Sequence, residues 1–176
     1  RDIPKQYIIG GVDRPNMRQD LQKIMSENGE RCQCIRCSEI RDRKCNLDNA
    51  KIIIRRYRSS GGDEYFIAYE SEQNSERFLH GFLRLRLSPD AGMCVSILED
   101  CALIRELHVY GQIIPTKLGN RDASNASQHH GIGKKLIKVA EKIAKSNNYK
   151  KIAIRSGVGV REYYRNRGYS LNNEYM

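Results

Sequence analysis

Long apolar segments are missing from this chain of 176 residues, which has a mean hydropathy of −0.67 and 30% charged residues. No apolar run approaches the ~18 residues that a membrane-spanning helix needs. The opening residues Arg1-Asp2-Ile3-Pro4 lack the apolar stretch of a secretory signal peptide. Membrane-spanning and secreted proteins are therefore excluded first, and we expect a cytoplasmic protein. Because an initiator Met is also lacking, we expect a piece of a longer protein.

Tryptophan is absent and the other aromatic residues are only 10 Tyr and 3 Phe, so the sequence shows no evident platform for stacking bases. Positive charge is abundant instead: 31 Lys and Arg stand against 21 Asp and Glu, a formal net charge of +10. Residues 1–60 hold 14 of the cations and 8 of the anions, so the first third is the most basic part. A polyanion such as nucleic acid is one partner that this charge favours, and a generic basic surface is the alternative.

Six cysteines are present, and without a secretory signal they are more typical of thiols or metal ligands than of disulfides. Three of them fall in the run Cys32-Gln33-Cys34-Ile35-Arg36-Cys37, a spacing at which thiolates can converge on one small cation. Zn²⁺ favours tetrahedral thiolate coordination, and Arg31 and Arg36 would help to keep the thiols deprotonated. Cys45 is the nearest candidate for a fourth ligand, and a residue outside this chain is the alternative. We predict a structural zinc site, with an iron–sulfur site or three incidental thiols as other interpretations.

The periodicity of apolar residues predicts the order of helices and strands. The expected elements are a helix at 16–28, strands at 51–58, 64–70, 78–87 and 101–110, a loop at 115–127, a helix at 132–147, a strand at 150–156, a short helix at 159–167 and a last strand at 169–175. Meandering strands followed by a β-α-β-α-β tail predict an α/β (α+β) fold, in which helices pack on a mixed sheet. We expect two parts, a linker helix with the cysteine-rich segment at 1–50 and one domain at 51–176.

A short glycine-containing stretch, Gln128-His129-His130-Gly131-Ile132-Gly133-Lys134, comes directly before the predicted helix at 132–147. Its glycines let the backbone approach a ligand closely, and the first N–H groups of a helix favour anions. Lys134 and Lys135 add positive charge, so a pyrophosphate suits this turn, although an ordinary helix start fits equally well. The spacing is neither that of a P-loop nor that of a Rossmann fingerprint.

The pattern Gln-x-x-Gly-x-Gly resembles the acetyl-CoA pyrophosphate motif of the GNAT superfamily of N-acetyltransferases. A later block, Tyr163-Tyr164-Arg165-Asn166-Arg167-Gly168-Tyr169, resembles the aromatic-Tyr-x-x-x-Gly-aromatic segment late in that fold. Together, the segments 105–111, 128–133 and 152–164 resemble the C-terminal acetyltransferase region of the catalytic subunit of Elongator, in its archaeal-type form. The run Cys32-x-Cys34-x-x-Cys37 matches the zinc-binding insert of that family. The resemblance covers nearly the whole chain, but the radical-SAM domain of the family is not in this sequence.

The resemblance implies a GNAT-like mixed, mostly antiparallel sheet flanked by helices, with a small N-terminal zinc-binding appendage. It implies that acetyl-CoA binds to one strand, to the glycine turn and to the tyrosine block. The residues concerned are Glu106, Leu107, His108, Val109, Gln128, His129, His130, Gly131, Ile132, Gly133, Lys134, Tyr163 and Tyr164.

The resemblance also implies roles in catalysis. A backbone N–H near Val109 would stabilise the oxyanion, and a tyrosine hydroxyl, Tyr164 in preference to Tyr163, would assist the departing thiolate. Glu106 and His108 should project to one face of their strand, where they are candidate bases. The alternatives are that both tyrosines pack in the core and that Glu106 pairs with Arg105 or Arg84.

The function implied by the resemblance is acetyl-CoA-dependent modification of the tRNA wobble uridine, in the carboxymethylation pathway. The acetyl unit would pass to a radical-SAM centre outside this chain, which would carry S-adenosylmethionine and an iron–sulfur cluster. The expected partners are tRNA, acetyl-CoA, the radical-SAM domain of the full-length protein, and a homodimer or an Elongator-like complex. Protein lysine N-acetylation and a non-catalytic tRNA-binding module are the alternatives. The residues expected to bind tRNA are Arg31, Arg36, Arg41, Arg43 and Lys44.

Overall fold

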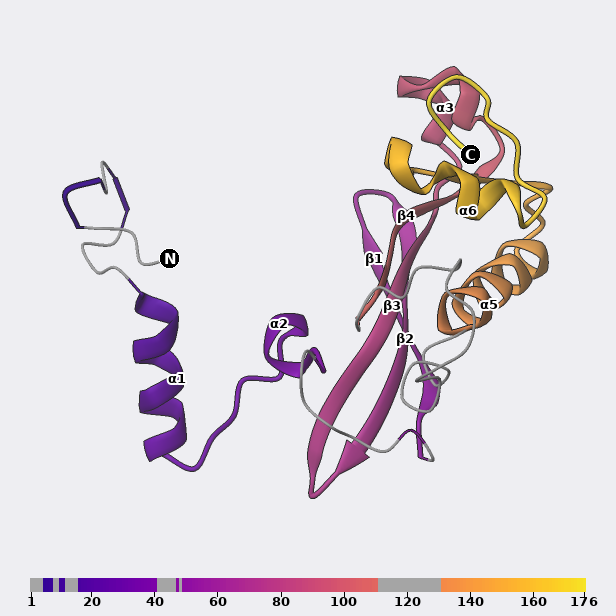
Figure 1. Ribbon diagram of the computed structural model, residues 1–176. Helices are drawn as coiled ribbons and strands as arrows, with labels where there is room; N and C mark the ends of the chain where they lie inside the picture. Colours follow the sequence, from indigo (N-terminus) through magenta and orange to yellow (C-terminus); the bar gives the residue numbers. More distant parts are fainter. Residues whose placement is uncertain (1–4, 8–9, 12–15, 41–46, 48, 111–130) are drawn as a thin grey trace. The chain divides into compact units, whose positions relative to one another are not determined.

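The computed structural model describes residues 5–7, 10–11, 16–40, 47, 49–110 and 131–176 (Figure 1). The chain divides into two compact units, Arg1–Ser38 and Glu39–Met176. The sequence placed a boundary after residue 50, whereas the units divide between Ser38 and Glu39. Residues 39 and 40 belong to the second unit because Glu39 forms a parallel bridge with Leu79 and the Ile40 N–H donates to the Leu79 carbonyl at 3.1 Å.

The first unit contains a short 3₁₀ helix η1 (Lys5–Tyr7) and two α-helices, α1 (Met17–Glu27) and α2 (Ile35–Ser38). The predicted helix at 16–28 is confirmed as α1. It ends where the Asn28 N–H bonds to the Ile24 carbonyl at 3.1 Å and Gly29 adopts φ 72°, a left-handed conformation that suits glycine. None of the α1 side chains is buried.

The second unit is built on a five-stranded sheet, in the order β1-β2-β3-β4-β5. Its strands are β1 (Lys51–Ser59), β2 (Gly62–Gln73), β3 (Glu76–Leu87), β4 (Cys101–Val109) and β5 (Lys151–Ile154). Neighbouring strands from β1 to β4 run antiparallel to one another, and β5 runs parallel to β4. This arrangement confirms the predicted mixed, mostly antiparallel sheet flanked by helices.

Two tight hairpins connect the first three strands. At Ser60-Gly61 and at Asn74-Ser75, both central residues have φ between 46° and 74°, as two-residue hairpin loops of type I′ require. Gly61 supplies one of the left-handed positions in the first hairpin, and the second hairpin carries no glycine in its loop. Register shifts interrupt the ladders between Tyr69 and Glu70 and between Arg84 and Leu85.

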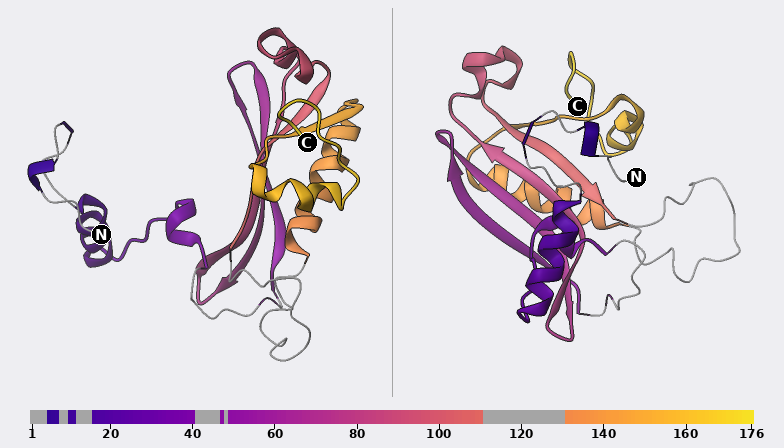
Figure 2. Two further views of the ribbon diagram at one scale, coloured as in Figure 1. Left: turned by 45° about the horizontal axis from the view of Figure 1, so that its top comes forward. Right: turned by 90° about the vertical axis from the view of Figure 1, so that its left-hand side faces the viewer.

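Helix α5 (Ile132–Ser146) lies along one face of the sheet (Figures 1 and 2). Its apolar residues recur at helical spacing and meet apolar residues that alternate along the strands. The side chains buried at this contact include Leu83, Leu85, Ile104, Leu136, Ile137 and Ala140. The predicted helix at 132–147 is therefore confirmed, and its contact with the sheet forms the main core.

The remaining elements are short: α3 (Ala91–Cys94), η2 (Ser96–Leu98), η4 (Val158–Val160) and α6 (Arg161–Arg165). The predicted strand at 169–175 is wrong. Asn173 has φ 51° and residues 171–174 are exposed, so the segment turns back on itself with a single bridge between Asn172 and Tyr175. Only Met176 pairs with the sheet, through two backbone hydrogen bonds to Ile154 at 2.7 and 3.1 Å.

Candidate functional site

The glycine turn lies at the N-terminus of α5. Gly131 has φ 104°, a conformation that L side chains rarely adopt, and the Lys135 N–H donates to its carbonyl at 2.8 Å. The N–H groups of Ile132, Gly133 and Lys134 therefore precede the first intrahelical bond of α5 and are available to an anion. Ile132 is 2% exposed and anchors this end of the helix in the core, while Lys134 is exposed.

The Tyr163 side chain of α6 lies against this turn. A Cβ added at Gly133 would collide with the Tyr163 hydroxyl and would lie 3.7 Å from a methyl group of Val109. Glycine at 133 thus lets the start of α5, the end of β4 and the Tyr163 hydroxyl meet at one point. The Arg167 guanidinium stacks 3.4 Å from the Tyr163 ring centroid and donates to the Tyr163 carbonyl. Burial raises the pKa of Tyr163, so its hydroxyl stays protonated at neutral pH.

Tyr164 occupies a different environment from its neighbour. It is 5% exposed in the main core, where its ring packs edge-on against Tyr163 and Tyr169 at centroid distances of 5.2 and 6.2 Å. Burial raises its pKa as well. Of the two hydroxyls, the one placed against the α5 turn is that of Tyr163.

Strand β4 diverges from β5 near this point. The two strands pair only from Cys101 to Ile104, and the last contact is a hydrogen bond of 3.0 Å from the Arg155 N–H to the Ile104 carbonyl. Within the described residues, Arg105–Val109 has no strand beside it on the β5 side. The open edge ends at Val109, next to Gly133. An extended amide chain could therefore pair with β4 there and reach the α5 turn.

Glu106 and His108 lie on the same face of β4, as alternation predicts, but this is the sheet face away from α5. Glu106 pairs with Arg84 at 3.5 Å, and the His108 ring stacks on Phe82 with a centroid distance of 6.0 Å. Leu107, between them, contributes to the main core on the α5 side. The structure thus brings Val109, Gly133 and Tyr163 together and places the two candidate bases elsewhere. Gln128, His129 and His130 lie outside the described residues.

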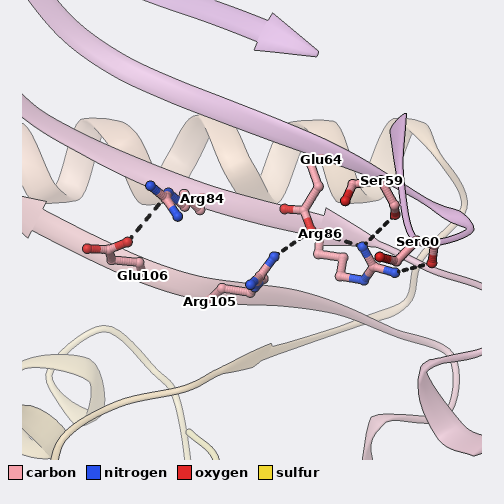
Figure 3. Close-up of polar contacts among 7 residues, drawn as sticks. All are labelled: Ser59, Ser60, Glu64, Arg84, Arg86, Arg105 and Glu106. Atoms are coloured by element: carbon pink, nitrogen blue, oxygen red, sulfur yellow. Dashed lines mark hydrogen bonds and ion pairs between the residues drawn. The ribbon is translucent and has the colours of Figure 1, made fainter. Parts of the chain in front are cut away.

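An arginine–glutamate network covers the sheet face that carries Glu106 (Figure 3). Glu64 is 1% exposed, and its Oε1 atom accepts from Arg86 at 2.9 Å and from Arg105 at 2.6 Å. Arg86 also donates to the carbonyls of Ser59 and Ser60, at 2.9 and 2.7 Å. The sequence predicted a strand at 78–87 and offered an Arg84–Glu106 pair as an alternative, which the structure contains. The partners of its arginines come from distant strands, and periodicity does not pair them.

The cysteine run forms a compact thiol cluster in the first unit. The Sγ atoms of Cys32, Cys34 and Cys37 all lie within 4.8 Å of one another. Three ligands of a tetrahedral zinc ion with Zn–S bonds of about 2.3 Å would be about 3.8 Å apart, so small adjustments would fit this ion. The cluster therefore supports a metal site, with three cysteine ligands in the described residues. Cys45, Arg41, Arg43 and Lys44 lie outside them.

Arg18 of α1 donates hydrogen bonds to two of these thiols, at 3.1 Å to Cys34 and 3.0 Å to Cys37. Gln22, one helical turn later, donates to Cys37 at 3.1 Å. The bond from Arg18, followed by a backbone hydrogen bond at Cys37, lowers the pKa of Cys34 to about 6. The sequence assigned thiolate stabilisation to Arg31 and Arg36, and it missed Arg18 because the contact depends on how α1 folds back on the cluster.

No helix among the described residues is long and apolar enough to cross a membrane.

The whole chain is similar in sequence to one part of several longer proteins. No protein-family model matches the chain. A tRNA uridine(34) acetyltransferase of Methanocaldococcus jannaschii is 39% identical over 184 residues, which cover 100% of this chain and 33% of that protein. Elongator complex protein 3 of Schizosaccharomyces pombe is 37% identical over 182 residues, which cover 100% of this chain and 32% of that protein. The chain thus spans about a third of the length of the curated relatives it matches.

A solved structure agrees with these relatives. The archaeal Elp3 of Methanocaldococcus infernus, with an N-terminal deletion, superposes with a TM-score of 0.74 at 35% identity. The match covers 100% of this chain and 42% of that one.

Proposed function

We propose that this chain binds acetyl-CoA and part of a tRNA within a longer enzyme that modifies the wobble uridine. Along its whole length the chain is homologous to a segment that makes up about a third of each tRNA uridine(34) acetyltransferase or Elongator complex protein 3. In this proposal the chain is the acyltransferase region of that enzyme. The acetyl unit would be delivered to a radical-SAM centre outside this chain. A homodimer or an Elongator-like complex, and a cytoplasmic location, belong to the same proposal.

The observation that carries the acetyl-CoA assignment is the meeting of three features at Gly133. The free N–H groups of α5 suit a pyrophosphate, the open edge of Arg105–Val109 suits the amide groups of the pantetheine arm, and the Tyr163 hydroxyl lies between them. Gln128, His129 and His130 directly precede this turn in the sequence and belong to the same proposed motif. Lys134 would add positive charge at its mouth.

The chemistry proposed for this site is attack on the thioester carbonyl by a nucleophile from outside this chain, which takes the acetyl group as the C–S bond breaks and coenzyme A leaves as the thiolate. The Val109 N–H would stabilise the oxyanion that develops there, since a backbone donor at fixed position needs no reorganisation. We assign the hydrogen bond to the departing thiolate to Tyr163 rather than to Tyr164, because the Tyr164 hydroxyl belongs to a ring buried in the core. Glu106 and His108 contribute backbone groups to the edge, but their side chains face away from the turn, so we assign them no proton transfer.

The thiol cluster would hold a structural zinc ion through Cys32, Cys34 and Cys37 in this proposal. Zinc would supply cross-linking between α2 and the segment before it, with no part in the chemistry. Exposed Arg31 and Arg36 would then stand beside a fixed loop and contact tRNA phosphates. Chelation of the zinc-loaded chain should remove structure from residues 16–38 only, as observed by NMR of their amides. Unchanged dispersion of these amide signals after chelation would contradict a structural metal.

The test of the acetyl-CoA site is Gly133→Ala. Because the added methyl group would collide with the Tyr163 hydroxyl, we expect acetyl-CoA affinity, measured by calorimetry, to fall at least about tenfold. Gly157→Ala is the matched control, since Gly157 has φ −67° and nothing within 4 Å of its missing Cβ. Equal affinity of the Gly133→Ala variant and the wild-type chain would contradict the site.

Turnover separates the alternative functions. Acetyl-CoA hydrolysis by the chain that tRNA stimulates would support the proposal. Acetylation of a lysine peptide without RNA would indicate a protein acetyltransferase instead. Binding of tRNA without any acetyl-CoA binding would indicate a non-catalytic RNA-binding module.

A further inference from the structure

The face of the sheet that points away from α5 combines exposed arginines with a row of aromatic rings. We propose that this face binds single-stranded RNA, with the arginines on phosphates and the exposed His108 ring of the aromatic row on an unpaired base. The inference rests on the proposed function for the identity of the RNA, namely the tRNA substrate. It adds a binding surface on the second unit, on the sheet face opposite the one that carries α5 and the acetyl-CoA turn.

The arginines of this face lie over buried carboxylates. The side chain of Glu64 is 2% exposed and that of Glu70 is 7% exposed, whereas the side chains of Arg105 and Arg55 are 46% and 42% exposed. Arg55 forms a two-pronged pair with Glu70, with N–O distances of 2.8 and 2.9 Å. In these two pairs the carboxylate is shielded from solvent and the arginine is presented to it, whereas in the Arg84–Glu106 pair both side chains are partly exposed, at 36% and 44%.

Such pairs orient the guanidinium groups before any partner arrives. A guanidinium has five N–H donors, and a bond to one carboxylate leaves several of them for a second acceptor. Five arginines of β1, β3 and β4 share three glutamates of β2 and β4, so these eight residues together carry a net charge of +2. The members are Arg55, Arg77, Arg84, Arg86 and Arg105 with Glu64, Glu70 and Glu106. A surplus held in fixed geometry suits a polyanion with regularly spaced phosphates.

The aromatic row crosses three strands beside these arginines. Phe66 of β2 stacks on Phe82 of β3 at a centroid distance of 5.2 Å, and Phe82 stacks on His108 of β4 at 6.0 Å. Tyr110 follows at 4.4 Å from His108. Phe82 is buried at 3% exposure, whereas His108 is exposed to solvent within the row. An unpaired base could therefore stack on the exposed His108 ring.

The two features are joined, because the Arg84 guanidinium lies over the Phe82 ring at 5.8 Å and also pairs with Glu106. A nucleotide whose base stacks on His108 would therefore have its phosphate within the arginine network. A sheet surface with stacking rings and flanking cations is the arrangement by which proteins bind unpaired nucleotides, whereas a duplex keeps its bases stacked internally. The face therefore favours a single-stranded loop over a helix.

The test compares arginines on opposite faces of the same strand. Arg55 faces the network, whereas its neighbour Arg56 pairs with Asp63 at 3.0 Å and lies over Tyr65 on the α5 side. Arg55→Gln leaves Glu70 paired with Arg77, and Arg56→Gln is the matched control. Fluorescence anisotropy would measure the affinity of each full chain for an anticodon stem-loop RNA and for a fully paired RNA of equal length, over a range of NaCl concentrations.

We expect Arg55→Gln and Arg84→Gln each to weaken stem-loop binding about three- to tenfold and to reduce the salt slope by about 0.7, the value for one phosphate of a single strand. Arg56→Gln should bind like the wild-type chain. His108→Ala should weaken binding about fivefold or more without changing the salt slope, since stacking is not ionic. The fully paired RNA should show no loss in the His108→Ala variant.

Several results would overturn the inference. Equal losses in Arg55→Gln and Arg56→Gln would mean that only total charge matters, and unchanged binding by His108→Ala would exclude stacking on this ring. If the face variants bind RNA normally but change their sedimentation, the face is a protein interface and not an RNA site. A wild-type chain that binds no stem-loop RNA would also refute the inference. Calorimetry with acetyl-CoA on the same chains shows separately whether the acetyl-CoA part of the proposed function fails.

Discussion

Glu64 is the charged residue on which we expect the stability of the sheet to depend most. Its carboxylate is almost fully buried and accepts from both Arg86 and Arg105 through one oxygen (Figure 3). Glu64→Gln keeps the size and an acceptor but removes the negative charge. Breaking a fully buried ion pair costs about 3–5 kcal/mol. Here Arg105 is half exposed and Arg86 keeps two backbone carbonyls, so we expect the free energy of unfolding to fall by about 2 kcal/mol.

Urea unfolding followed by circular dichroism would measure this loss, and the thermal midpoint should fall by about 4–8 °C for a chain of this size. The control is Glu106→Gln, which removes a carboxylate that is 44% exposed and 3.5 Å from Arg84. An exposed pair of this kind contributes about 0–1 kcal/mol, so the control should change little.

Equal stabilities of the Glu64→Gln and Glu106→Gln variants would refute the reasoning. A gain in stability on Glu64→Gln would also refute it, because the desolvation cost of burying the carboxylate would then exceed the stabilisation from its two arginine pairs. In either case the exposed guanidiniums would not be held by a carboxylate beneath them. The electrostatic part of the proposed RNA surface would then lose its basis.

Three further predictions concern the core, one exposed ion pair and the thiol cluster. Leu136→Ala should lower the unfolding free energy by about 2–5 kcal/mol in urea, because Leu136 is fully buried, and a loss below ~1 kcal/mol would contradict the assigned core. The hydrogen bond from Arg56 lowers the pKa of Asp63, so the pair stabilises the fold above the unfolded pKa of about 3.9, and this stability is lost as pH falls through the folded pKa. Arg56→Gln should therefore reduce the dependence of the unfolding free energy on pH in this acid range. An unchanged pH dependence would exclude a contribution of this pair. In the metal-free chain, the rate of Cys34 alkylation by iodoacetamide should rise with pH with a midpoint at about 6, and Arg18→Gln should move this midpoint to higher pH. An unchanged midpoint in the variant would exclude Arg18 as the cause of the lowered Cys34 pKa.

Much of the fold could be predicted because its signals are local. The apolar spacing of Leu136, Ile137 and Ala140 is sufficient to define α5, and Ser60-Gly61 is sufficient to define the first hairpin. The position of the glycine turn followed from that of α5, because the turn directly precedes the first residue of this helix. The binding of acetyl-CoA to the strand that contains Glu106–Val109 was expected from the family resemblance rather than from any property of the strand.

What the sequence could not supply are contacts between distant elements. The choice between Tyr163 and Tyr164 depends on which ring α6 turns toward Gly133, and adjacent tyrosines carry no signal of that rotation. The extra residue at the register shift of β4 brings Arg105 to Glu64, and no spacing rule predicts such a shift. The predicted strand at 169–175 was wrong because residues 170–174 are exposed and have no core to contact.

The outer edge of the sheet bears on how the chain behaves at high concentration. Within the described residues β1 has a neighbour on one side only, so its other side exposes unpaired N–H and C=O groups that another chain could pair with. The strand carries four exposed cations, Lys51, Arg55, Arg56 and Arg58. Two copies meeting edge to edge would bring these charges together, which disfavours polymerisation through β1. High salt screens this repulsion and should therefore bring the chain closer to aggregation.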